Sequence, residues 1–399
     1  MKLNIGMMLQ HPLEYSLGTT TTVLSLAKAL AKQGSTVYIF SPLEKTRKIA
    51  EKLYLYNIKT SFSSLKIYKV IKLIYNYPFF ARKLILNVKM IEKSVSQLVY
   101  ATLKSIEKNS IELDVIQGEQ EIPSMAAIRI AKKLNIPSIA HFHNVWAEEA
   151  IDIGLATKQD STLKSLTKQI TSQADLIITP TPYMLEYFKQ NYSPKRVVYV
   201  PRGASLIKED RVDYRPPYRV VYSGTLAKHE NVDLYVKAAN LVNQEKPKLD
   251  VEFYITGKGE DASKIKKLAE KMGLSMNFLW FPTKEEYQKF LSICHIGIIP
   301  WDNKISRRLG FPMKLLDYAA AGMVTIATNI GGWTEIVDEE KIGILVEPTP
   351  RDMAYGIIYL LTNPNQIVER GQRAQRFAGK QTWDKSAEIL LKEYLYLLC

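Results

Sequence analysis

The chain has 399 residues, of which 46% are hydrophobic and 24% charged, a composition typical of a globular protein. At this length two domains are the default expectation. Without a run of about 18 apolar residues a membrane-spanning helix is not expected, and the first residues indicate a buried strand rather than a signal peptide. The two cysteines, Cys294 and Cys399, exclude a disulfide framework, so we expect a reducing, cytoplasmic setting.

The net charge of +14 is concentrated between residues 44 and 104, where thirteen basic residues face three acidic ones. Tyrosines and phenylalanines are interleaved with these basic residues. One interpretation is that this segment binds an anionic lipid surface, where each lysine contributes about 1 kcal/mol to the binding free energy. The other interpretation is that the basic residues form a solvated helical face while the tyrosines pack in the core. Since no nucleic-acid motif accompanies the charge, we expect peripheral membrane contact and no nucleic-acid partner.

The first half of the sequence alternates predicted strands and helices. Strands alternating with helices of this length indicate a parallel, doubly wound sheet. The strands are expected at residues 2–9, 35–42, 113–119, 137–144 and 174–181, and the helices at 20–34, at 123–135 and directly after residue 181.

A second alternating series begins after residues 211–219, where charge, proline and tyrosine replace the periodic pattern. We therefore expect two α/β domains with a cleft between them, at residues 1–208 and 209–381, and a final helix at 382–399. In the second domain strands are expected at residues 218–225, 249–260, 276–282, 295–301 and 323–329, and helices at 233–244, 262–273, 285–294 and 312–322.

The segment from Arg307 to Trp333 contains the strongest candidate for a ligand site. Pro312 suits the first turn of a helix, and Gly322 ends it. The N–H groups of that first turn attract phosphate, Arg308 lies just before it, and Asp317 could accept from ribose hydroxyls. The alternative is a buried strand–helix corner with surface arginines.

Residues 141–146 follow a strand at the carboxyl edge, where doubly wound sheets bind ligands. We expect His143 to be functional and His141 to point to the opposite face, because strand residues alternate. The alternative is a core-edge histidine bonded to backbone. Nearby glutamates could position an acceptor hydroxyl, and we assign acceptor binding to Glu121 with Trp146; the other glutamates are Glu119, Glu148 and Glu149.

Several motifs, in order along nearly the whole chain, resemble those of retaining GT-B glycosyltransferases of family 4. Phe311, Asp317, the AAAG turn at 319–322 and GGWTE at 331–335 resemble the nucleotide-sugar site of that family. The other stretches that resemble it are ADLIITPTPYM, VPRGAS (in place of V-P-N-G-V-D), YSGTLAKHENVDLYVKA and YITGKGED.

The resemblance implies two Rossmann-like domains facing a cleft, with the last helix crossing back to the first domain. It also implies sugar transfer with retention from a nucleoside diphosphate sugar, without a metal or another cofactor. The expectation that the acceptor is a glycan or lipid-linked glycan at the membrane rests on the basic, aromatic segment alone. His143, which aligns with the family histidine, would be catalytic, and we assign a catalytic role to Arg308 as well, although no family residue corresponds to it. The implied donor-binding residues are Gly18, Thr19, Gly224, Thr225, Lys228, Gly257, Gly259, Phe311, Met313, Lys314, Leu315 and Asp317.

The sequence departs from the family pattern at three positions. Leu309 replaces the first acid, and Thr225 and Glu230 replace the Arg and Lys that bind the donor phosphates. Arg308 is the first choice for a substitute cation because a guanidinium binds phosphate oxygens bidentately. The other candidates are Lys228, His229, Arg307 and Lys314. Two alternatives stay open: a degenerate GT-B domain that binds without transfer, and a soluble transferase acting on a small metabolite.

Overall fold

The computed structural model describes residues 2–13, 18–42, 45–58, 88–157, 161–207 and 214–399. The chain divides into two compact units, each described by itself below. Unit 1 comprises Met1–Arg202, Leu309–Phe311 and Trp383–Cys399, and unit 2 comprises Gly203–Arg308 and Pro312–Thr382. Among the described residues, no helix is long and apolar enough to cross a bilayer.

Unit 1 contains a sheet with the strand order β3-β4-β2-β1-β5-β6-β7-β8. All neighbours pair in parallel except β3, which runs antiparallel to β4 at one edge. The strands are β1 (Asn4–Met8), β2 (Thr36–Ser41), β3 (Arg47–Ala50), β4 (Leu53–Asn57), β5 (Val115–Glu119), β6 (Ser138–His141), β7 (Leu176–Thr179) and β8 (Val197–Tyr199).

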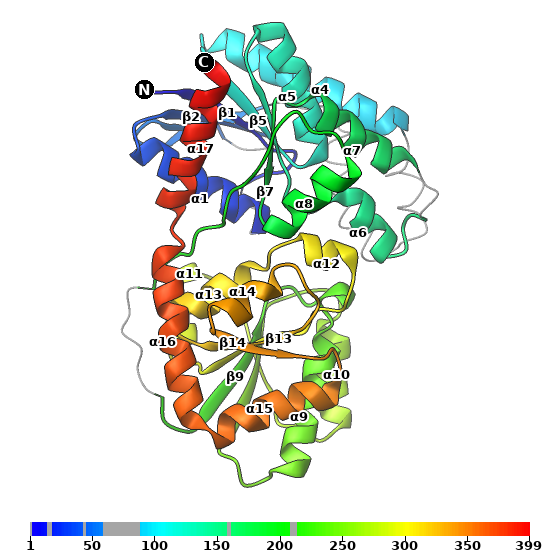
Figure 1. Cartoon of the computed structure of the whole chain (residues 1–399), viewed down its shortest axis with the longest axis vertical. Helices are drawn as coiled ribbons and strands as arrows, with labels where there is room; N and C mark the ends of the chain where they lie inside the picture. The colour runs from blue at the N-terminus through cyan, green and yellow to red at the C-terminus, as the bar shows by residue number, and fades with distance from the viewer. Residues whose placement is uncertain (1, 14–17, 43–44, 59–87, 158–160, 208–213) are drawn as a thin grey trace. The chain divides into compact units, whose positions relative to one another are not determined.

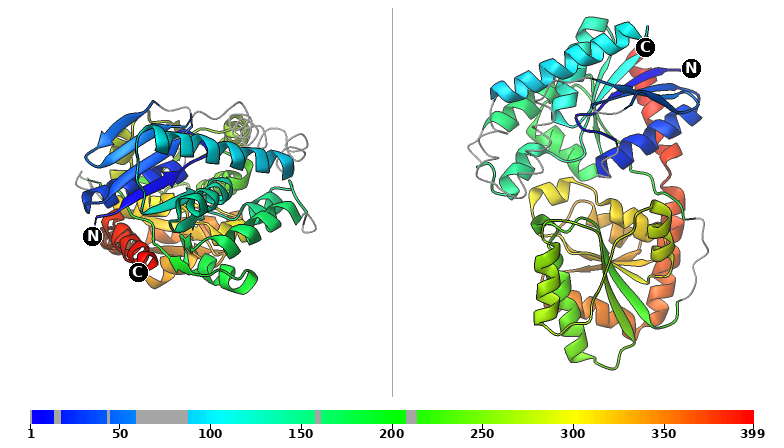
Figure 2. Two further views of the ribbon diagram at one scale, coloured as in Figure 1. Left: turned by 90° about the horizontal axis from the view of Figure 1, so that it is seen from above. Right: turned by 180° about the vertical axis from the view of Figure 1, so that it is seen from behind.

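Helices cover both faces of this sheet, as Figures 1 and 2 show, with α1 and α17 packed together on one face and α4, α5 and α7 on the other. Buried side chains of β1, α1 and α17, such as Ile5, Leu26 and Leu390, form one core cluster. The helices are α1 (Gly18–Lys32), α4 (Val88–Lys108), α5 (Glu121–Leu134), α6 (Trp146–Asp152), α7 (Ser161–Gln173), α8 (Pro182–Asn191) and α17 (Trp383–Leu398).

Unit 2 contains an all-parallel sheet with the strand order β11-β10-β9-β12-β13-β14. Its strands are β9 (Tyr218–Ser223), β10 (Val251–Thr256), β11 (Asn277–Leu279), β12 (Ile296–Ile299), β13 (Val324–Thr328) and β14 (Gly343–Val346). Helix α9 packs with α10 and α15, and α13 packs with α16 and α11 (Figure 1). The helices are η1 (Lys228–Glu230), α9 (Val232–Glu245), α10 (Ala262–Lys271), α11 (Lys284–Ser292), α12 (Ile305–Leu309), α13 (Met313–Ala320), α14 (Thr334–Glu339), α15 (Pro350–Thr362) and α16 (Pro364–Lys380).

Both alternating series predicted from the sequence are confirmed, and so is the final helix, which packs against α1 within unit 1. Local signals explain several boundaries. Helix α8 begins where the Thr181 hydroxyl accepts from the Met184 N–H and Pro182 fills the first position. Much of the basic, aromatic segment, residues 59–87, lies outside the described residues, so the expectation for it stays a prediction.

Candidate active site

The carboxyl end of β5 in unit 1 carries a buried glutamate bonded to two histidines. Oε2 of Glu119 lies 2.8 Å from Nε2 of His143 and 3.0 Å from Nδ1 of His141. Its Oε1 accepts from the Gln117 amide at 2.6 Å. Both oxygens are therefore engaged. Burial alone would raise the pKa of Glu119, but attraction and hydrogen bonds from His141 and His143 hold it well below its usual range.

The prediction that His141 points away from His143 is wrong. The two ring centroids lie 4.3 Å apart, and both rings face Glu119. The physical reason is that strand side chains repeat with a period of two, so residues 141 and 143 belong to the same face, and only adjacent residues point to opposite faces.

The protonation state of His143 follows from its partners. Nη2 of Arg202 lies 2.9 Å from Nδ1 of His143. Because arginine only donates, Nδ1 accepts, and the ring proton sits on Nε2, which donates to Glu119. Burial and repulsion from His141 lower the pKa of His143 to about 3, so the imidazole is neutral at pH 7.

The ligand atoms of Glu119, His141 and His143 lie within 4.8 Å of one another, a spacing compatible with a metal ion. A metal bound to His143 would need the lone pair of Nε2. With Arg202 donating to Nδ1, that nitrogen carries the proton instead. The residues present therefore fit a hydrogen-bonded cluster better than a metal site.

The structure brings together the two residues assigned to acceptor binding, Glu121 and Trp146. Oε1 of Glu121 accepts from the Trp146 backbone N–H at 2.7 Å, at the start of α6. Within the described residues, its buried Oε2 has no hydrogen-bond partner. Burial raises the pKa of Glu121 to about 8, so this carboxyl is mainly protonated at pH 7. Nearby, Glu148 accepts from the Tyr187 hydroxyl at 2.8 Å and Glu149 accepts from Asn144.

Gly18 and Thr19 form the first turn of α1. The Thr22 hydroxyl donates to the Gly18 carbonyl at 2.8 Å and accepts from Nη1 of Arg202 at 2.6 Å. This turn is thereby connected to the Arg202–His143–Glu119 chain within unit 1.

In unit 2, glycines bring the turns after β9 and β10 into backbone contact. A Cβ on Gly257 would lie 1.9 Å from the Gly224 carbonyl oxygen, and one on Gly259 would lie 2.0 Å from the Leu226 carbonyl oxygen. Gly257 has φ +130°, which also disfavours a side chain. Gly257 therefore packs against Gly224, and Gly259 packs against Leu226. Among the other predicted donor residues, Thr225 and Lys228 are exposed beside this turn.

A cluster of charged and aromatic side chains lies beside Gly224. Nζ of Lys314, from the first turn of α13, lies 2.7 Å from Oε2 of Glu230 and 3.1 Å from the Tyr222 hydroxyl. A Cβ on Gly224 would lie only 3.0 Å from that ammonium. The Trp301 indole N–H donates to the same carboxylate oxygen at 3.0 Å. Glu230, the residue in place of the family's lysine, therefore holds a lysine next to the Gly224 backbone.

The cluster contains Arg307, not Arg308. Nη1 of Arg307 lies 3.7 Å from Oε1 of Glu230, and its guanidinium stacks 4.7 Å from the Trp301 ring centroid. Arg308, the first choice from the sequence, instead donates from Nε to Asn303 at 2.8 Å. Burial alone would raise the pKa of Glu230, but Lys314 and Arg307 hold it below its usual range. Two cations facing one carboxylate leave the cluster positive.

Asp317 lies one turn farther along α13, where the sequence predicts a ribose-binding carboxylate. It accepts from the Tyr287 hydroxyl at 3.4 Å, and Tyr287 shares a 2.6 Å hydrogen bond with the Ser223 hydroxyl. Burial raises the pKa of Asp317 to about 6. On the same helix Met313 is half-buried and Leu315 is buried, and Phe311 is half-buried in the turn before it.

Several residues of these clusters were missed by sequence reasoning, and Arg202 and Tyr287 are two of them. Arg202 stands where the resembled motif has Asn in V-P-N-G, a signal that was visible. Tyr287 is an ordinary residue of a polar helix, and no local signal marks it. Glu230 was identified from the sequence only as a position where the family's lysine is missing.

Matches to two protein families identify the class of enzyme to which this chain belongs. Residues 17–207 match the family described as Glycosyltransferase Family 4, and residues 206–377 match Glycosyl transferases group 1. This chain is a GT-B glycosyltransferase of the family 4 type. An uncharacterized glycosyltransferase of Methanocaldococcus jannaschii is 26% identical to it over 76% of this chain and 81% of the relative. A D-inositol 3-phosphate glycosyltransferase of Paenarthrobacter aurescens is 19% identical over 77% and 79%.

Solved structures agree on the fold of this glycosyltransferase. A sucrose-phosphate synthase from Thermosynechococcus elongatus aligns over 99% of both chains with a TM-score of 0.78 and 16% identity. The S. aureus protein TarM aligns over 99% of both chains with a TM-score of 0.71 and 14% identity. At these identities the likeness establishes the GT-B fold alone.

Proposed function

We propose that this glycosyltransferase takes its sugar from a nucleoside diphosphate sugar bound in unit 2. The observation that carries the proposal is the Lys314 ammonium held against the Gly224 turn by Glu230. Lys314 and Arg307 supply the positive charge that Thr225 and Glu230 do not. Preorganised cations stabilise a departing diphosphate without rearranging during the reaction.

The start of α13 supports the same assignment. Its first-turn N–H groups and helix dipole favour phosphate oxygens beside Lys314. Asp317, one turn farther along, accepts from ribose hydroxyls when it is ionised. The TarM structure was determined with UDP, a ligand of this class.

We propose transfer with retention and without a metal. The acceptor oxygen forms the new bond to the sugar's anomeric carbon as the bond to the phosphate oxygen breaks, and the acceptor proton passes to that phosphate oxygen. The state of two acidic residues in unit 1 supports a mechanism in which no side chain of the enzyme acts as the general base. Glu119 has both oxygens hydrogen-bonded, and Glu121 is already protonated at pH 7. Neither is suited to remove a proton or attack the sugar.

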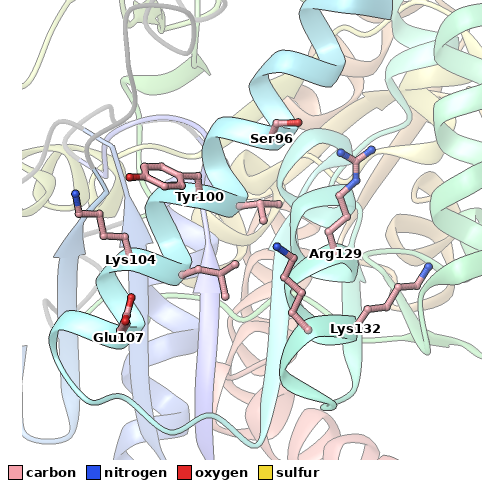
Figure 3. A pocket seen from close by; sticks show the side chains of 9 residues that line it. Ser96, Tyr100, Lys104, Glu107, Arg129 and Lys132 are labelled. Atoms are coloured by element: carbon pink, nitrogen blue, oxygen red, sulfur yellow. The ribbon is translucent and has the colours of Figure 1, made fainter.

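The acceptor proposed is a glycan or lipid-linked glycan held at an anionic membrane. A hollow of about 720 Å³ between α4 and α5 supports this surface, and Figure 3 shows Lys104, Arg129 and Lys132 around it. Tyr100, at its rim, is 68% exposed, with the Lys104 ammonium 5.9 Å from its ring centroid. Exposed rings and cations together suit headgroup depth. A relative from Kluyveromyces lactis, 24% identical over 51% of this chain and 44% of its own length, is a chitobiosyldiphosphodolichol beta-mannosyltransferase.

Vesicle flotation tests the membrane surface. We expect the protein to float with phosphatidylglycerol vesicles at low salt and to be released at high salt. Changing Lys104, Lys132 and Lys133 to Glu should abolish flotation. The matched control makes the same charge change on α10 of unit 2, at the exposed Lys264, Lys266 and Lys267. Failure of the unmodified protein to float would remove the membrane part of the proposal. Flotation of the variant changed at Lys104, Lys132 and Lys133 would mean that the membrane-binding surface lies elsewhere on the protein.

A calorimetric titration with UDP, GDP and ADP, followed by a donor-release assay, tests the function. We expect one nucleotide to bind and its sugar to be released. Lys314→Ala should weaken binding about tenfold or more, because hydrogen bonds to charged groups contribute about 1.5–3 kcal/mol. Lys237→Ala, which removes an exposed lysine paired with Asp233 on α9, should leave binding unchanged. Nucleotide binding without release or transfer for any donor would favour the degenerate domain.

A further inference from the structure

Helix α17 places a buried tyrosine hydroxyl against β5. Tyr394 is fully buried in the core cluster that α17 shares with α1 and the sheet of unit 1. Its hydroxyl donates to the Oε1 carbonyl oxygen of Gln117, a fully buried residue of β5. Burial holds the pKa of Tyr394 well above its ordinary value, so the hydroxyl keeps its proton and stays a donor. The final helix therefore makes a polar contact inside the core as well as apolar ones.

This contact fixes the orientation of the Gln117 amide. The amide nitrogen donates to Oε1 of Glu119 at 2.6 Å. Because Glu119 is a carboxylate and only accepts, the amide turns its NH2 group toward Glu119 and its oxygen away. The Tyr394 hydroxyl supplies the donor that this oxygen needs. Without it, a buried carbonyl oxygen would lack a hydrogen bond, and this orientation of the amide would be less favourable.

The register of the sheet brings two histidines to the same carboxylate. Glu119 of β5 is paired with His141 of β6, and side chains at paired positions lie on one face of a sheet. Oε2 of Glu119 meets Nδ1 of His141 at 3.0 Å and Nε2 of His143 at 2.8 Å. A continuous chain of hydrogen bonds therefore runs from the Tyr394 hydroxyl to the His143 ring.

Both ring nitrogens of His143 are engaged. Nε2–H donates to Glu119, and Nδ1 accepts from Nη2 of Arg202 at 2.9 Å. Such a ring neither takes up nor releases a proton without losing a partner. Its contribution to a reaction therefore depends on the place and direction in which it is held. Buried hydrogen-bond networks rigidify the groups that they connect.

We propose that Tyr394 is a positioning residue for sugar transfer, which acts through Gln117 and Glu119 to hold the His143 imidazole in one orientation. This inference rests on the proposed function and on the catalytic assignment of His143. Since Tyr394 and Gln117 are fully buried, neither touches substrate. The final helix thus contributes to the candidate active site of unit 1 from within the core.

Imidazole N–H resonances test the chain without reference to activity. The full-length protein is labelled with ¹⁵N-histidine, and the His143 Nε2–H signal is identified by its loss in His143→Gln. Tyr394→Phe keeps the buried ring and removes only the hydroxyl. We expect the Nε2–H signal to shift in this variant and to exchange with water faster, because Glu119 is held less firmly.

Two tyrosines provide matched controls. Tyr396 lies on the same helix but is 64% exposed. Tyr235, in unit 2, has a buried hydroxyl that donates to the Val220 carbonyl at 2.8 Å. Tyr396→Phe and Tyr235→Phe should both leave the His143 signal unchanged. If Tyr394→Phe does not fold, Gln117→Met, which breaks the chain at its next member, replaces it in each measurement.

Steady-state kinetics connect the chain to transfer. Tyr394→Phe should lower kcat about tenfold or more and leave the donor KM unchanged, because a catalytic group is displaced while binding contacts stay. Gln117→Met should have the same effect. The double variant should lose no more activity than either single variant, since the two residues act along one path. Additive losses would contradict a role of Tyr394 through Gln117.

The outcomes separate this inference from the proposed function. If the wild-type protein transfers sugar and Tyr394→Phe leaves the His143 signal or kcat unchanged, the positioning role is overturned and the proposed function stands. If the wild-type protein transfers no sugar, the proposed function fails, and the imidazole signal alone decides whether Tyr394 holds His143. An unchanged signal without any transfer overturns both.

Discussion

The Lys314 ammonium and the Glu230 carboxylate form an ion pair 2.7 Å long whose side chains are only 10% and 11% exposed. These residues are 84 positions apart, and the sequence around either one does not indicate that they pair. Position 230 lacks the phosphate-binding lysine of the family, but its glutamate holds another lysine, Lys314, in place. This pair organises the proposed donor site.

The pair should also stabilise unit 2. Removing one partner of a buried ion pair leaves the other charge unpaired, which costs about 3–5 kcal/mol. We expect Glu230→Gln to lower the free energy of unfolding by about 3 kcal/mol, at the low end because Tyr222 still accepts from Lys314. Urea denaturation measures this change.

A double-mutant cycle separates the pair from its surroundings. Glu230→Gln combined with Lys314→Met should be more stable than Glu230→Gln alone, because the unpaired ammonium is gone. Strictly additive losses would show that the two side chains are not energetically coupled.

Donor binding should depend on pH through Asp317. Burial raises the pKa of this carboxyl to about 6, and only its ionised form accepts two ribose hydrogen bonds. Affinity should therefore rise as pH increases through 6 and level off above about 7. A nucleoside diphosphate sugar is the right probe, because its phosphates do not titrate in this range.

Asp317→Asn provides the control for that titration. The amide cannot ionise, so the affinity of this variant should be lower and flat from pH 5 to 8. A wild-type affinity that does not change over this range would remove Asp317 from ribose recognition.

Glu121 should make stability depend on pH. Burial raises its pKa in the folded protein to about 8 from an ordinary value of 4.5. The folded state therefore keeps a proton that the unfolded chain releases. The corresponding stabilisation is complete below about pH 4.5, declines as pH rises toward 8, and is lost above that.

Glu121→Gln removes this dependence, because the amide resembles the neutral acid in shape and charge. The wild-type protein should lose stability relative to the variant by up to about 1.4 kcal/mol per pH unit between pH 5 and 8. Unfolding by urea at several pH values measures the difference. Parallel curves would mean that Glu121 is ionised in the folded state.

Transfer should not require a metal. The donation from Arg202 to Nδ1 of His143 leaves the proton on Nε2, so the Glu119–His141–His143 group offers one nitrogen fewer than its spacing suggests. We expect no stoichiometric zinc by elemental analysis and full transfer activity in excess EDTA. Activity that disappears with EDTA and returns with one divalent ion contradicts this account of His143.

Local patterns predicted the parts of the fold that depend on local chemistry. Pro312 marked the start of α13 because its fixed φ suits a first turn, and Gly322 marked the end. The strands of unit 2 were predictable because each is a short apolar run between turn residues.

The site was less predictable because its decisive contacts join distant segments. Nothing near Glu230 indicates that Lys314 lies against it, and nothing near His143 indicates that Arg202 fixes its tautomer. His141 was assigned to the wrong face because the alternation rule was misapplied: residues two apart, such as 141 and 143, share a face of a strand. Arg308 was chosen because a guanidinium binds phosphate oxygens bidentately, a reason that applies equally to Arg307 and says nothing about the direction of either side chain.

A crystal structure with bound UDP or GDP tests the donor site most directly. The account predicts diphosphate density beside the first turn of α13, with phosphate oxygens within hydrogen-bonding distance of Nζ of Lys314 and ribose hydroxyls on Asp317. Density for the nucleotide at another place in unit 2, with Lys314 still bonded only to Glu230 and Tyr222, would contradict it.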